Sequence, residues 1–169
     1  PGIEFVGATA EGRRVAAVVP NGAYAETIAV RESALVEIPD GIDDEQAAGI
    51  MIQGVTADGV LSISGNLKAG ETVVVGAAAG GTGSLAVQLA RSMGAGKVIG
   101  LASGEEKQQL VLGLGADAVV DSRSPDLGDE VLEAAGGPVD LVLEMAGGDS
   151  FDQLLGTLAP FGRMIVVGI

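Results

Sequence analysis

The feature that most constrains the fold lies near the middle of the chain, where an apolar strand, a glycine-rich turn and an amphipathic helix follow one another (71–94). Thr72 to Val75 form a continuous β-branched run, which predicts a strand buried on both faces. Small residues follow, and apolar residues then recur with a helical period until Gly94, a predicted helix end. A strand, a glycine turn and a helix in this order are typical of dinucleotide-binding sites.

The turn departs from the usual G-x-G-x-x-G pattern, because alanine stands at its first position and glycine at its second and third. Small residues let a pyrophosphate approach the backbone, and the N–H groups and positive dipole end of the helix attract its charge. The alternative that the motif leaves open is an ordinary glycine-rich turn without a ligand. We predict cofactor contacts from five residues of the turn, namely Ala78, Gly80, Gly81, Thr82 and Gly83.

Strands and helices alternate from the turn to the end of the chain. Further strands are predicted at 97–101, 118–120, 139–143 and 164–167, with helices at 105–114, 127–135 and 151–158 between them. Ser103 and Glu106 have the spacing of a capping box at the start of the first of these helices. The alternation implies right-handed crossovers and a doubly wound parallel α/β sheet of the Rossmann type, with five of the usual six strands.

The first part of the chain has a different pattern. Short strands are predicted at 3–6, 14–19, 23–30 and 34–38, separated by glycine and proline turns. Asp43 or Asp44 begins a helix that reaches about Gly54, and a second helix covers 56–64. We therefore predict two parts: 1–42 as the tail of a β-rich domain, and 43–169 as the dinucleotide-binding domain.

The composition excludes several classes of function. The chain has 9 basic and 23 acidic residues, and this net charge of −14 argues against nucleic-acid binding. It contains neither cysteine nor histidine, so it lacks thiol nucleophiles, histidine bases and the ligands that zinc prefers, and we expect no metal site. No apolar run reaches the roughly 18 residues of a membrane span, which favours a cytoplasmic protein. The chain begins without methionine and stops in an apolar strand, so we expect a longer intact protein.

An ordered set of short motifs resembles the medium-chain dehydrogenase/reductase superfamily, and within it the zinc-free quinone oxidoreductase and enoyl reductase branch. The resemblance covers nearly the whole chain and rests on PGIE (1–4), GAYAE (22–26), IPDG (38–41), KAGETV (68–73), AAAGGTG (77–83), LGAD (114–117) and GR (162–163). It implies that residues 1–42 end a GroES-like catalytic domain. It also implies an NADPH-dependent oxidoreductase with a small-molecule substrate, which forms a homodimer when intact.

Cofactor choice in this fold is set at the end of the second strand, where an acidic residue favours NADH. The chain has Leu-Ala-Ser-Gly (101–104) there, without an acid. By resemblance, Ser103 and Lys107 contact the 2′-phosphate of NADPH; the alternatives are a helix cap and an exposed lysine. Arg123 is a further candidate cation. We therefore expect NADPH rather than NADH.

Further cofactor contacts are expected from other parts of the chain. Met145 and Ala146 follow the fourth strand at its carboxyl end, where open α/β sheets bind ligands. The resemblance adds Thr56 and the end of the fifth strand near the nicotinamide, namely Val167, Gly168 and Ile169. Each of these positions is equally consistent with an ordinary turn or helix cap.

The sequence supports three functions. The first is hydride transfer from NADPH to a quinone or an α,β-unsaturated carbonyl. The second is an enoyl-reductase domain of a polyketide-type synthase, acting on an enoyl thioester, and the third is NADPH binding without catalysis. No residue is predicted to be catalytic, and the one tyrosine, Tyr24, is expected to pack within the fold.

Overall fold

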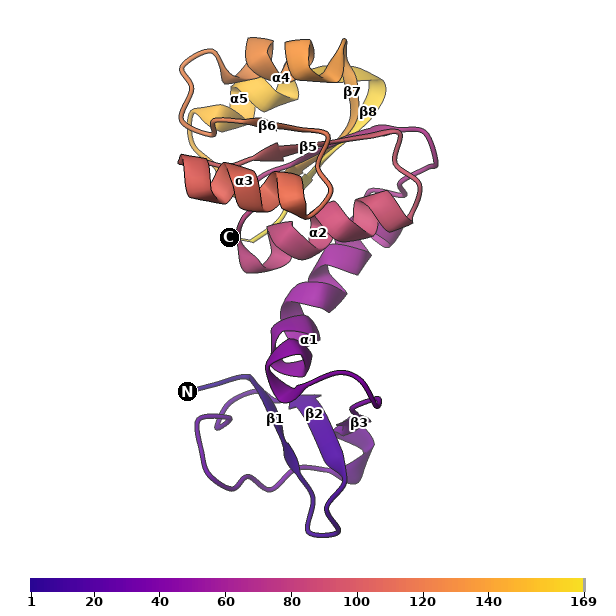
Figure 1. Ribbon diagram of the computed structural model, residues 1–169, viewed down its shortest axis with the longest axis vertical. Helices are drawn as coiled ribbons and strands as arrows, with labels where there is room; N and C mark the ends of the chain where they lie inside the picture. Colours follow the sequence, from indigo (N-terminus) through magenta and orange to yellow (C-terminus); the bar gives the residue numbers. More distant parts are fainter. Residues whose placement is uncertain (169) are drawn as a thin grey trace. The chain divides into compact units, whose positions relative to one another are not determined.

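The structure is a computed structural model that describes residues 1–168 (Figure 1). It divides into two compact units, Pro1–Val55 and Thr56–Ile169.

The first unit contains a small antiparallel sheet. Its strands are β1 (Glu4–Ala8), β2 (Arg14–Val18) and β3 (Val36–Glu37), in the order β1-β2-β3, and the short 3-10 helix η1 (Glu32–Ala34) precedes β3. The strand predicted at 23–30 is wrong, because this segment has no ladder partner. Its start is held by the first residues of the chain instead: the N–H of Ala23 donates to the carbonyl of Gly2 at 3.1 Å.

A long helical stretch follows this sheet in the chain. The helix α1 (Asp44–Asp58) continues directly into the π-helical segment η2 (Gly59–Ser64), so the predicted break near Gly54 is wrong. Asp43 caps α1 as expected: its carboxylate accepts the N–H of Gln46 at 2.7 Å, and the Gln46 side chain accepts the N–H of Asp43 at 3.2 Å.

By length and composition alone, the 21 residues of this helical stretch are enough to cross a membrane. The apolar runs of the sequence did not indicate this length, because polar residues interrupt them. The indication is weak, because core helices of soluble proteins meet the same criteria.

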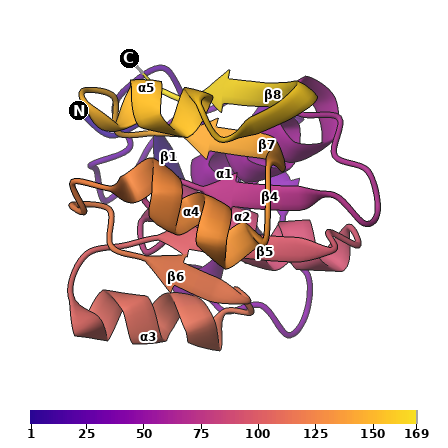
Figure 2. The same ribbon diagram turned by 90° about the horizontal axis from the view of Figure 1, so that it is seen from above.

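The second unit is the predicted doubly wound sheet. Its strands are β4 (Thr72–Val75), β5 (Lys97–Leu101), β6 (Ala118–Val120), β7 (Val139–Glu144) and β8 (Leu158–Val166). They are parallel and lie in the order β6-β5-β4-β7-β8, which Figure 2 shows from bottom to top. The chain therefore reverses its direction of travel across the sheet between β4 and β7, and this is the switch point at which such sheets bind ligands.

Helices cover both faces of this sheet. Alternate strand residues divide between two cores, because successive side chains of a strand point to opposite faces. On one face Val73 and Val98 pack with α2 (Gly81–Ser92), α3 (Glu105–Gly113) and η2. On the other face Val74 and Ile99 pack with α4 (Leu127–Ala135) and α5 (Ser150–Leu155), and Figure 2 shows α2 and α4 on opposite sides of the strands.

Near the end of the second unit, two element boundaries differ from the sequence prediction by three residues or more. The last helix ends at Leu155 rather than near 158, and β8 begins at Leu158, which pairs with Val139. A register shift follows in β8, where Phe161 has a φ of 67°. Periodicity alone did not reveal this irregular strand start, because its pairing depends on a distant strand.

The predicted capping box at α3 is also wrong. The N-cap of α3 is Gly104, with a φ of 86°, and no side chain caps this helix. A glycine tolerates this backbone conformation, so Gly104 rather than Ser103 takes the N-cap position, and the helix begins at Glu105 as predicted. The hydroxyl of Ser103 is consequently not used as a helix cap.

Candidate functional site

The glycine-rich turn leads from β4 into α2 through one strained residue. Ala77 has a φ of 43°, a left-handed conformation that is costly for a residue with a Cβ. Its carbonyl accepts the N–H of Gly80 at 2.8 Å, and Gly80 is the N-cap of α2. The first turn of α2 carries no acidic side chain, so its backbone N–H groups form a positive helix end without a competing carboxylate.

The turn packs tightly against the helix that it begins. A Cβ at Gly83 would overlap the carbonyl of Ala77 and would lie 2.8 Å from the Cα of Ala78. Ala78 is fully buried, and its N–H donates to the carbonyl of Leu101 at 3.0 Å. Within the predicted fingerprint, Gly83 and Ala78 therefore bring α2, the turn and β5 together.

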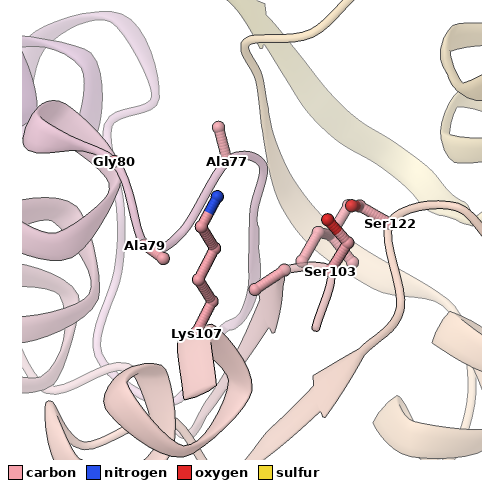
Figure 3. Close-up of a pocket in the computed structure, with 8 residues that line it drawn as sticks. Ala77, Ala79, Gly80, Ser103, Lys107 and Ser122 are labelled. Atoms are coloured by element: carbon pink, nitrogen blue, oxygen red, sulfur yellow. The ribbon is translucent and has the colours of Figure 1, made fainter. Parts of the chain in front are cut away.

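A pocket of about 280 Å³ opens beside this turn at the carboxyl ends of β4, β5 and β6. Figure 3 shows Lys107 reaching from α3 toward the turn, with Ser103 and Ser122 across the pocket from it. Eight residues line the pocket: Ala77, Ala79, Gly80, Leu101, Ala102, Ser103, Lys107 and Ser122. Of the predicted site residues, the structure brings Gly80, Ser103 and Lys107 together here.

The pocket lining is positively charged. Lys107 is the one charged residue among the eight lining residues, and none of them is acidic. Glu105 and Glu106, in the same helical turn as Lys107, do not line the pocket. Arg123 pairs with Asp121, where its backbone N–H and guanidinium together lower the pKa of the carboxyl.

This arrangement suits a phosphate group. An ammonium group and two hydroxyls can donate to phosphate oxygens, and the start of α2 adds backbone N–H groups and a positive dipole. No lining carboxylate opposes the charge of such an anion. The pocket and the neighbouring turn therefore have the charge and the donors that suit phosphate groups.

The remaining predicted contacts lie elsewhere. Met145 and Ala146 follow β7, and Val167 and Gly168 follow β8; these are the carboxyl ends of two neighbouring strands. Thr56 lies inside α1, so its alternative role as a helix cap is wrong. None of these residues lines the pocket beside the turn, nor do Gly81 and Thr82. Ile169 lies outside the described residues.

Sequence comparison identifies the family. Residues 81–169, more than half of the chain, match the zinc-binding dehydrogenase family. The chain belongs to this family. Its relatives place it in the quinone oxidoreductase and enoyl reductase branch, as the sequence motifs predicted.

Three relatives illustrate this branch of the zinc-binding dehydrogenase family. A quinone oxidoreductase of Pseudomonas aeruginosa is 38% identical over 93% of this chain and 49% of its own length. A phenolphthiocerol/phthiocerol polyketide synthase subunit of Mycobacterium tuberculosis is 36% identical over 93% of this chain and 7% of its own. The quinone oxidoreductase of Thermus thermophilus, solved also with NADPH, superposes with a TM-score of 0.89 at 42% identity, over 99% of this chain and 54% of that one. The chain thus spans about half the length of the stand-alone relatives that it matches.

In this member of the family, one residue at the sheet edge was not among the predicted site residues. Glu144, the last residue of β7, is 2% exposed, and its carboxylate Oε1 accepts the N–H groups of Ala146 and Gly147 at 2.9 and 2.8 Å. An acid that ends an apolar strand and precedes two glycines could have indicated this role. Ser122 was not among the predicted site residues, and the pocket geometry adds it to the candidate site.

Proposed function

We propose that the chain binds NADPH and forms the cofactor-binding part of an oxidoreductase that reduces a quinone or an α,β-unsaturated carbonyl. The observation that carries this proposal is the pocket beside the glycine turn. It combines Lys107, Ser103 and Ser122 with no carboxylate. A lining of this kind favours the 2′-phosphate of NADPH over the bare ribose of NADH.

In this proposal the cofactor spans the carboxyl edge of the sheet. Lys107 and Ser103 hold the 2′-phosphate, and the turn from Gly80 to Gly83 receives the pyrophosphate. Ala78 is buried and has a structural role, because its N–H joins the turn to β5. The segments after β7 and β8 are proposed to face the nicotinamide half, together with Thr56; their contact residues are Met145, Ala146, Val167 and Gly168.

When bound, NADPH would supply a hydride to the acceptor, and a proton from solvent would complete the reduction. The protein's task is to orient the nicotinamide and to exclude water. We assign no catalytic acid to this chain. The substrate is proposed to be a small molecule in the cytoplasm.

A second candidate is the enoyl-reductase domain of a polyketide-type synthase. The similarity to the mycobacterial synthase subunit over 93% of this chain favours it. The two candidates share the cofactor and the hydride chemistry and differ in the acceptor, a free quinone or an enoyl thioester. Rates of NADPH oxidation by the intact protein with p-benzoquinone and with a crotonyl thioester separate them.

The cofactor is tested by titrating this chain with NADPH and with NADH while nicotinamide fluorescence is recorded. We expect saturable NADPH binding that is at least about tenfold tighter than NADH binding, which corresponds to about 1.4 kcal/mol. Equal affinities would contradict the assignment of the 2′-phosphate to the pocket. Absence of binding by both cofactors would contradict the proposed function of this chain.

A further inference from the structure

Glu144 is unusual because it buries a carboxylate at the edge of the sheet. Among residues 1–168, it is the one acidic residue with a buried side chain, at 2% exposure. A charge removed from water is costly unless hydrogen bonds compensate it. Here two successive backbone N–H groups, from Ala146 and Gly147, donate to the same oxygen, Oε1.

These bonds fix the start of the turn, whereas its later part is held by the Ser150 hydroxyl, which donates to the carbonyl of Gly147 at 3.0 Å, and by the N–H of Phe151, which donates to the carbonyl of Gly148 at 3.1 Å. Gly147 and Gly148 both have positive φ values, 68° and 73°, and residues 146–149 are exposed. Two consecutive glycines give a backbone many accessible conformations. The bonds from Glu144 therefore select one conformation for the start of this turn, since charge-assisted hydrogen bonds are stronger than neutral ones.

The turn lies at the switch point between β4 and β7. The N–H of Gly76, the first residue after β4, donates to the carbonyl of Leu143 at 2.8 Å. A Cβ at Gly76 would lie 2.8 Å from that carbonyl oxygen and 3.3 Å from the nitrogen of Met145. The glycine-rich turn after β4 and the turn after β7 are therefore in close contact where they leave the sheet.

The backbone of Glu144 also orders the neighbouring strand end. Its carbonyl accepts the N–H of Val167 at 2.8 Å, just beyond β8. One residue thus holds two segments that the proposed function assigns to the nicotinamide half of the cofactor. The side chain holds the turn after β7, and the main chain holds the end of β8.

We propose that Glu144 is a positioning residue for the nicotinamide half of bound NADPH. It acts by fixing the backbone of Met145–Gly148 at the crevice between β4 and β7, without touching the reacting atoms. This inference rests on the proposed NADPH function. It concerns a different part of the site from the pocket that holds Lys107, so the two halves of the cofactor can be tested separately.

The test compares two ligands on this chain. Adenosine 2′,5′-bisphosphate carries only the adenine half with its 2′-phosphate, whereas NADPH adds the nicotinamide half. For Glu144→Ala we expect NADPH affinity to fall about tenfold, the size expected for losing hydrogen bonds to a charged group. Affinity for adenosine 2′,5′-bisphosphate should stay within about twofold, and the fluorescence change of bound nicotinamide should diminish. Glu144→Gln, whose amide oxygen can still accept, should restore most of the NADPH affinity.

The matched control is Asp149→Ala, which removes an exposed acidic side chain from the same loop. The side chain of Asp149 makes no capping hydrogen bond to α5. This substitution should leave both affinities unchanged. A Glu144→Ala protein that binds both ligands normally, or that loses both equally, would overturn the positioning role. Failure of the unaltered chain to bind either ligand would instead overturn the proposed function, and the inference with it.

Amide exchange gives a readout that needs no cofactor. The amides of Ala146 and Gly147 should exchange more slowly than that of Gly148 in the unaltered chain. Both should lose this protection in Glu144→Asp, whose carboxylate is one methylene too short to reach them. Equal exchange of all three amides in the unaltered chain would overturn the inference, even if Glu144→Ala failed to fold.

Discussion

Arg163 and Glu71, 92 residues apart in the chain, form a two-pronged ion pair at the amino end of the parallel sheet. Nη1 of Arg163 lies 2.8 Å from Oε1 of Glu71, and Nη2 lies 2.7 Å from Oε2. The guanidinium also donates to the carbonyl oxygens of Gly65 and Asp140. It therefore joins the end of η2 to β7 and β8 and to the residue before β4.

This ion pair predicts a specific dependence of stability on pH. The hydrogen bond from Arg163 holds the pKa of the Glu71 carboxyl below its usual value. Because the folded pKa is the lower one, the pair contributes fully above the usual carboxyl pKa, and its contribution is lost as the pH falls through the lowered value. Glu71→Gln should therefore lower the free energy of unfolding at neutral pH and flatten its decline in acid, as measured by urea unfolding.

The control for this prediction is Glu133→Gln, an exposed glutamate on α4, which should leave the acid profile unchanged. Arg163→Ala should cost about 2 kcal/mol at neutral pH, because it removes the guanidinium donors from the partly buried Glu71 carboxylate and from the carbonyl groups of Gly65, Asn66 and Asp140. An Arg163→Ala protein with the stability and acid profile of the unaltered chain would show that the pair contributes nothing.

The two glycines of the turn should respond differently to alanine. Gly83→Ala introduces a Cβ that overlaps the backbone of Ala77, so we expect a loss of more than about 2 kcal/mol of unfolding free energy. Gly80→Ala places its Cβ 3.1 Å from the Ala77 carbonyl, which a small shift can relieve, so its cost should be below about 1 kcal/mol. Thermal unfolding of both variants measures the two losses of stability. A larger loss for Gly80→Ala than for Gly83→Ala would contradict the tight packing of Gly83 against Ala77.

Strain at Ala77 predicts a stabilising substitution. Its φ of 43° is accessible to glycine without the steric cost of a Cβ, whereas alanine gains by restricting the unfolded chain. We expect the strain term to prevail, so Ala77→Gly should raise the unfolding free energy by about 0.5–1 kcal/mol. Ala79→Gly, at the neighbouring pocket residue that has no positive φ, should lower it in the same urea titration. Destabilisation by Ala77→Gly would show that the turn stores no strain at this residue.

The proposed function assigns the choice between NADPH and NADH to a single cation, Lys107. Lys107→Glu should weaken NADPH binding by at least about tenfold and leave NADH binding nearly unchanged, because it places a negative charge beside the 2′-phosphate. Ser103→Ala should have a smaller effect in the same direction. Lys68→Glu makes the same charge change at an exposed lysine outside the pocket and serves as the control. Equal losses for both cofactors in Lys107→Glu would refute a role in 2′-phosphate recognition.

Local sequence patterns were enough to predict most elements of the sheet domain. The β-branched run at 72–75 and the helix 127–135 appear at the expected residues, because their apolar periods match the faces that they bury. Gly94 ends its helix with a φ of 86°, as its position after the last apolar residue predicted. The alternation of strands and helices also indicated the parallel order of the sheet.

Individual residues of the candidate site could be predicted from the sequence, but their arrangement in space could not. The glycine turn, Ser103 and Lys107 were identified in the sequence, but three facts needed the folded chain. The hydroxyl of Ser103 is not a helix cap because Gly104 takes that position. Arg123 is engaged by Asp121. Glu144, which resembles an ordinary strand end in the sequence, is buried and holds the turn that follows it.

The sequence by itself determined the strand–turn–helix units and the small residues that let a phosphate approach the backbone, because both depend on neighbours within a few positions. Only the tertiary structure decided the irregular course of 23–30, the early start of β8 and the ion pair between Glu71 and Arg163. Each of these depends on residues far along the chain. A contact between two distant segments does not change the hydrophobic period of either segment. It can therefore be recognised only in the folded structure.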